Sequence, residues 1–79
     1  MDVVEYNGFE IQAKPYQLAD NGEWQVNLHI VRHRGSESRS RNFSAANSYK
    51  TREEAATHCF HLGKQIVDGQ SANFSVADL

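Results

Sequence analysis

The chain contains few residues of the kinds that staple small domains or anchor proteins in membranes. It has one cysteine, and no apolar run comes near the roughly 18 residues that span a bilayer. The lone Cys59 excludes an internal disulfide and a multi-cysteine zinc site. The chain opens with acidic rather than basic residues, so we expect no secretory signal. These absences predict a cytoplasmic protein that is held together by packing and has no membrane partner.

Internal repeats, low-complexity tracts and linkers are absent as well. A hydrophobic content of 39% with 23% charged residues is typical of a globular protein, and 79 residues suffice for one domain with a thin core. We expect that domain to span residues 1–69. In residues 70–79 three large apolar residues stand among small and polar ones, and because chain termini of small domains usually fray, we expect a flexible tail there.

Alternation of apolar and polar residues predicts two strands. Residues 9–13 place Phe9, Ile11 and Ala13 on one face, and Pro15 ends this strand because proline donates no hydrogen bond to a ladder. We expect a loop from there to residue 23. The clearest alternation spans residues 24–34, where every second residue is apolar: Trp24, Val26, Leu28 and Ile30.

A third strand over residues 38–46 follows from the turn between them. Gly35 and Ser36 suit a two-residue type II′ turn, which requires glycine at its first central position. That turn fixes the register and matches apolar with apolar residues. It predicts three cross-strand pairs: Leu28 with Phe43, Val26 with Ala45, and Arg34 with Glu37.

The segment from residue 52 to residue 68 predicts one amphipathic helix. Thr51 and Glu54 match the capping box, and Gly69 suits the position after the helix end. One broad arc of this helix is apolar and the other is charged and polar. The predicted fold class is therefore α+β: a three-stranded antiparallel β-meander with one C-terminal helix packed on one face, in the order β-β-β-α.

Several short motifs carry a family resemblance. "YNGFEI", Trp24 in a strand, "YKTREEAA" and "GKQIVDG" resemble a group of short bacterial domains of unknown function, over residues 6–69. The order of elements is more distantly similar to the HicB antitoxin and to part of the double-stranded-RNA-binding fold. The chain departs from the latter because no helix precedes the first strand and "TREEAA" is acidic. The resemblance therefore implies a fold and does not carry RNA binding with it.

A carboxylate and two imidazoles share the polar arc of the predicted helix. Glu54, His58 and His61 follow one another at helical spacings, and Gln65 extends the row. Such a set matches the ligands of a facial metal site. The alternative is a solvated helix face, because an exposed arc offers no water-excluding pocket. We expect the solvated face, with no metal and no cofactor.

Cys59 is the only candidate nucleophile that we consider. The helical arc points it toward the sheet, and buried cysteines usually act as small apolar residues. Nucleophilic catalysis needs an adjacent base, and the neighbouring histidines lie on the opposite arc. We therefore expect no catalytic residue and no enzyme.

Basic charge is concentrated in one segment. Residues 31–41 hold four arginines and one glutamate, and the rest of the chain holds four basic and nine acidic residues, within a net charge of −2. Because an eleven-residue strand is longer than the predicted helix, this hairpin is expected to overhang the core. In one interpretation the guanidinium groups of this hairpin bind phosphates. In the other they keep the hairpin edge soluble and prevent it from pairing with another strand. The candidate nucleic-acid- or anion-binding residues are Arg32, Arg34, Arg39 and Arg41.

One face of the predicted sheet has no helix to cover it. Small domains often gain burial by pairing sheets or edges, so a protein partner or a homodimer is expected. The leading functional prediction is thus a non-enzymatic binding or regulatory module that contacts protein through its sheet face or edge. The alternative is nucleic-acid or anion binding by the arginine hairpin.

Overall fold

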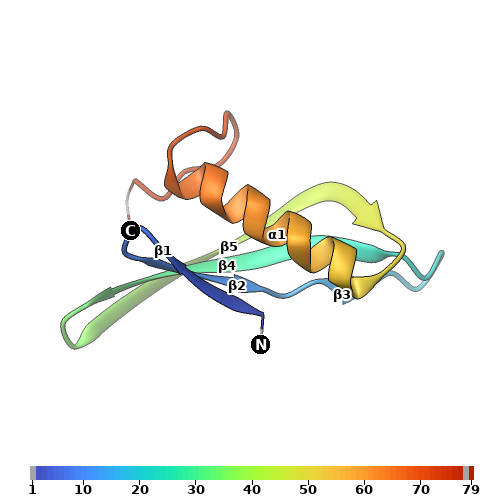
Figure 1. The fold of residues 1–79 in the computed structure, drawn as a ribbon, viewed down its shortest axis with the longest axis horizontal. Coiled ribbons are helices and arrows are strands. Elements are labelled where there is room, and N and C mark those ends of the chain that lie inside the picture. The colour runs from blue at the N-terminus through green and yellow to red at the C-terminus, as the bar shows by residue number, and fades with distance from the viewer. Residues whose placement is uncertain (1, 78) are drawn as a thin grey trace.

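A single helix lies across one face of an antiparallel sheet (Figure 1). The computed structural model describes residues 2–77 and 79. Among these residues no helix is long and apolar enough to cross a membrane. The elements, in chain order, are β1 (Val3–Tyr6), β2 (Phe9–Ala13), β3 (Tyr16–Gln17), β4 (Trp24–Arg34), β5 (Glu37–Tyr49) and α1 (Arg52–Val67).

The sheet has five strands, so the predicted three-stranded β-β-β-α meander is wrong, although the class is α+β. The first strand missed is β1, which pairs with β2. Asn7 and Gly8 join them with φ values of 50° and 83°. Two consecutive positive values define a type I′ turn, which matches the twist of paired strands.

The second strand missed is β3, within the segment predicted as a loop. Tyr16 pairs with Gln25, and Gln17 pairs with Trp24. β3 therefore continues along the same edge of β4 as β2, after the interruption at Pro15. The central strand β4 is flanked by β2 and β3 on one side and by β5 on the other.

The predicted register of the long hairpin is confirmed over most of its length. Leu28 lies opposite Phe43 and Arg34 opposite Glu37. Gly35 has a φ of 60° whereas Ser36 keeps a negative φ, as a type II′ turn requires. Beyond Asn27 the register shifts, because β5 bulges there. The shift replaces the expected pairing of Val26 with Ala45 and lets β5 run on to Tyr49.

Both predicted ends of α1 are formed. The Glu54 backbone N–H donates to the Thr51 hydroxyl over 3.2 Å. At the other end the Gly69 N–H donates to the Ile66 carbonyl and the Gln70 N–H to the Gln65 carbonyl, at 3.1 and 2.8 Å. These two bonds form a Schellman motif, for which Gly69 supplies a φ of 74°.

The core lies between α1 and the inward face of β2, β4 and β5. At its centre α1 comes so close to the sheet that a Cβ on Gly63 would stand 2.6 Å from Cγ2 of Ile11. Residues after the helix close the core beyond its end, where Phe74 packs edge-on against Phe43 at 5.4 Å. The fully or almost fully buried apolar side chains are Ile11, Ala13, Val26, Leu28, Ile30, Phe43, Ala55, Ala56, Cys59, Ile66, Val76 and Leu79.

Candidate functional site

The hairpin of β4 and β5 carries its arginines on one face. We call residues 32–41 the arginine ribbon. Arg32 lies opposite Arg39, and Arg41 lies opposite Ile30, whose side chain is buried under the helix side of the sheet. Residues that lie opposite each other, or two apart on one strand, share a face. All four arginines, Arg34 included, therefore lie on the face that carries α1.

The ribbon extends past the end of α1, as Figure 1 shows. A strand of 11 residues measures about 36 Å and a helix of 16 residues about 24 Å. Every residue from His33 to Asn42 is exposed. Beyond Arg32, where the pairing of β4 with β2 ends, the hairpin is a two-stranded ribbon outside the core.

Neighbouring groups hold three of the guanidinium groups. Arg32 lies over the Phe9 ring at 5.3 Å, and its Nη1 donates to the Leu79 backbone oxygen over 3.2 Å. Arg34 Nη2 donates to the same oxygen over 2.9 Å. Arg41 Nη1 donates to the Ser75 carbonyl over 3.4 Å. These contacts hold three of the four arginines, while Arg39, opposite Arg32, is exposed.

Within the ribbon, basic residues outnumber acidic ones. Glu37, opposite Arg34, is the one acidic residue within the ribbon. Arg32 and Arg39 face each other directly, an arrangement of like charges that destabilises a strand pair. The face is therefore suited to bind an anion with several oxygens.

The opposite face of the sheet carries a separate polar cluster. Glu10 accepts a hydrogen bond from Gln12 and lies 3.5 Å from His33 Nε2. These two partners, Gln12 foremost, lower the pKa of the Glu10 carboxyl group. The cluster sits behind the ribbon and not on its arginine face.

The candidate metal ligands are not assembled into a metal site. Glu54 lies at the helix start beside Thr51. The His58 ring stacks in parallel on Tyr49, with centroids 4.0 Å apart, and lies 6.3 Å from the His61 ring. Among residues 2–77 and 79 no three His, Cys, Asp or Glu side chains are grouped closely enough to hold a metal ion.

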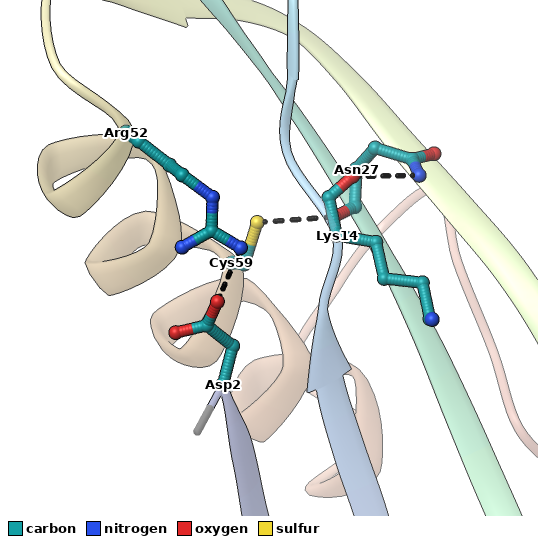
Figure 2. A network of polar contacts seen from close by, with 5 residues as sticks. All are labelled: Asp2, Lys14, Asn27, Arg52 and Cys59. Atoms are coloured by element: carbon teal, nitrogen blue, oxygen red, sulfur yellow. Dashed lines mark hydrogen bonds and ion pairs between the residues drawn. The ribbon is translucent and has the colours of Figure 1, made fainter.

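Cys59 lies in the core, where Figure 2 shows it between α1 and the sheet. Its thiol donates to the Asn27 carbonyl over 3.2 Å, and Asn27 Nδ2 donates to the Lys14 carbonyl over 3.1 Å. Burial raises the pKa of the Cys59 thiol, which disfavours the nucleophilic thiolate. Nearby, Arg52 at the helix start pairs with Asp2 of the N-terminal segment, and this bond lowers the pKa of Asp2. The contacts of Cys59 and Arg52 therefore have a structural role, because they connect the helix to the sheet and to the N-terminal segment.

Two contacts of the candidate site were not predicted from the sequence. The stack of Tyr49 on His58 depends on the bulge that extends β5, and together with His61 and Gln65 it lines a surface hollow of about 230 Å³. The contacts of Arg32 and Arg34 with Leu79 join positions far apart in the chain. The three apolar residues after the helix were the available signal for the second contact, because they require burial.

Comparison with known proteins identifies a family. A family model described as "Transcriptional activator HlyU" matches residues 1–74. No curated protein and no solved structure matches the chain. The predicted likeness to HicB and to short domains of unknown function is not confirmed by these comparisons. Because the family model covers nearly the whole sequence, the chain belongs to the family of transcriptional activator HlyU.

Proposed function

We propose that this protein is a non-enzymatic transcriptional regulator of the cytoplasm that binds duplex DNA through the arginine ribbon. The proposal combines the family description with one geometric observation. The observation is that Arg32, Arg34, Arg39 and Arg41 share one face of the β4–β5 hairpin, whose residues 33–42 are exposed.

The dimensions of DNA agree with such a ribbon. The major groove of B-form DNA is about 12 Å wide and admits a two-stranded β-ribbon. Arginine forks donate in pairs to phosphate oxygens and to the guanine edge. A ribbon that overhangs its core enters a groove without a collision between the helix and the DNA backbone.

Protection of a sheet edge accounts for Arg39 and Arg41, which lie on the edge strand β5, but not for Arg32. Edge charges are useful on strands whose backbone groups lack a partner. Arg32 lies on β4, which at that position pairs with β2 on one side and with β5 on the other. Solubility also gives no reason to place Arg32 directly opposite Arg39, where like charges repel.

The helix is a poor candidate for the DNA-binding element. A helix-turn-helix needs two helices, and the residues that the structure describes form one α-helix. Its first turn is acidic, with Glu53 and Glu54 both exposed. Phosphates are repelled there, so the ribbon is the better interface.

The test is a binding titration with a short, labelled, mixed-sequence DNA duplex, followed by fluorescence anisotropy over a range of salt concentrations. Arg39→Ala with Arg41→Ala is expected to weaken binding and to flatten its salt dependence. If each arginine neutralises one phosphate, the slope of log K against log salt falls by about two.

A matched variant separates the ribbon from net charge. Lys14→Ala with Lys50→Ala removes the same charge from exposed positions outside the ribbon. This variant is expected to keep most of the affinity and the salt slope. Equal, weak binding by all three proteins would contradict the proposal.

Protein–protein contact through the open sheet face, or a homodimer, stays a prediction. Sedimentation over a range of concentrations tests it, because a constant monomer mass excludes self-association.

A further inference from the structure

The segment that follows the helix lies on the arginine face. We call the described residues after the helix, 70–77 and 79, the C-terminal segment. Two guanidinium groups, those of Arg32 and Arg34, converge on the one backbone oxygen of Leu79 at 3.2 and 2.9 Å. Farther back along the ribbon, Arg41 binds the Ser75 carbonyl. Backbone oxygens of this segment therefore occupy donors on three of the four arginines.

Apolar contacts hold the segment in this place. Val76 and Leu79 are each 6% exposed, and Phe74 packs edge-on against Phe43. A hydrogen bond of 3.0 Å from the Leu79 N–H to the Val76 carbonyl closes a local turn. The Leu79 oxygen lies within hydrogen-bond distance of both Arg32 and Arg34.

The same donors are the ones that a phosphate needs. A phosphate oxygen bridged by two arginines takes the position that the Leu79 oxygen holds. A duplex that approaches the arginine face also meets the segment itself, because the segment lies on that face. The segment and the DNA backbone thus exclude each other at Arg32 and Arg34.

We propose that the C-terminal segment is a displaceable cover that competes with DNA for Arg32 and Arg34. The inference rests on the proposed function and adds its regulation. Arg39, which is exposed opposite Arg32, makes the first contact with phosphate. Full engagement then requires the Leu79 oxygen to leave its two guanidinium partners.

The free energy needed to displace the C-terminal segment sets the apparent affinity of the protein for DNA. When only a fraction of molecules is competent to bind, the apparent dissociation constant rises by the reciprocal of that fraction. With about nine-tenths of molecules covered, release of the segment tightens binding about tenfold.

The first experiment uses the unaltered chain and nuclear magnetic resonance. The backbone amides of Val76, Ala77 and Leu79 are followed while the mixed-sequence DNA duplex is added. On saturation we expect their chemical shifts to move to random-coil positions and their heteronuclear Overhauser effects to fall. Helix amides, such as that of Ala56, are expected to remain ordered and serve as the internal reference.

The second experiment releases the segment by substitution. Val76→Ser with Leu79→Ser removes the two buried anchors and keeps every arginine, and is expected to tighten DNA binding about tenfold. Ala72→Ser with Ala77→Ser makes a similar change at two exposed positions of the same segment and is expected to bind as the unaltered chain does. Amide shift dispersion of the helix and sheet reports whether each variant is folded.

The outcomes separate the two proposals. If DNA binds while Val76 and Leu79 keep their ordered amide signals, the cover is refuted and the DNA-binding ribbon stands. If neither the unaltered chain nor the released variant binds DNA, the proposed function fails and the cover fails with it. Binding that displaces the segment, and that tightens in the released variant, supports both.

Discussion

The Tyr6 hydroxyl donates a hydrogen bond of 2.7 Å to a carboxylate oxygen of Asp68, the residue that caps the C-terminus of α1. The other oxygen of Asp68 accepts from Asn7 Nδ2 over 3.2 Å. The turn between β1 and β2 is thereby tied to the end of the helix.

The Tyr6 pair predicts an alkaline titration. The bond to Asp68 raises the pKa of the Tyr6 phenol, because ionisation removes the donated proton beside a carboxylate. The stability that the bond contributes is present below the ordinary tyrosine pKa of about 10 and is lost as pH rises through the raised value. The difference in tyrosinate absorbance between the unaltered chain and Tyr6→Phe isolates this titration. Asp68→Asn is expected to move it to lower pH, and an unchanged curve in that variant would refute the assignment.

Substitution of Gly63 by alanine is expected to destabilise the protein, although alanine favours helix formation. Alanine gains about 1 kcal/mol of helix propensity over glycine, but its methyl group would stand 2.6 Å from Ile11. Overpacking of a core costs about 1–3 kcal/mol, so Gly63→Ala is expected to lower the free energy of unfolding by about 1 kcal/mol in urea titration.

A double-mutant cycle identifies the cause of that loss. In an Ile11→Ala background the two Ile11 carbons are gone and the 3.2 Å approach to Leu28 Cδ1 remains, so adding Gly63→Ala is expected to cost much less or to be neutral. Gln65→Ala, on the exposed side of the same helix, serves as the control and is expected to change stability by less than about 0.5 kcal/mol. The same loss in both backgrounds would place the strain elsewhere.

The buried Cys59 thiol is expected to react slowly with thiol reagents in the folded protein. The thiol has no exposed surface and a pKa raised by burial, so a thiol reagent reaches it only after local opening. We expect labelling with a disulfide reagent to be at least about a hundredfold slower in the native protein than in the unfolded chain. Rapid labelling at neutral pH would show that the join between α1 and β4 opens readily.

The parts of the fold that sequence predicts are those with local signals. Alternation located β2 and β4, Gly35 positioned the long hairpin, and Thr51 and Gly69 bounded the helix. In each case a residue type has a conformational preference that acts within a few positions, so no tertiary contact is needed to predict the element.

The missed elements depend on contacts between distant residues or on a signal given too little weight. β3 has two residues and is defined only by its pairing with β4. β1 had a signal in Asn7-Gly8, a preferred hairpin turn, but Val3 and Val4 follow no alternating pattern. The shared face of the arginines was predictable from register, whereas their binding to Leu79 depends on how the last residues cross the sheet.

Arg32 and Arg39 face each other across the strands, so one substitution there is expected to change protein stability and DNA binding in opposite directions. Arg39→Glu replaces a like-charge pair with an opposite-charge pair across the strands, which is expected to stabilise the protein by about 0.2–1 kcal/mol. The same change places a carboxylate on the face proposed to meet phosphate, so DNA binding is expected to fall below that of Arg39→Gln. Thermal unfolding and anisotropy measure the two effects on one sample.

A variant that is more stable and binds DNA as well as the unaltered chain would show that Arg39 makes no contact with phosphate. A variant that binds less and is more stable would show that the ribbon keeps a destabilising charge pair for its function.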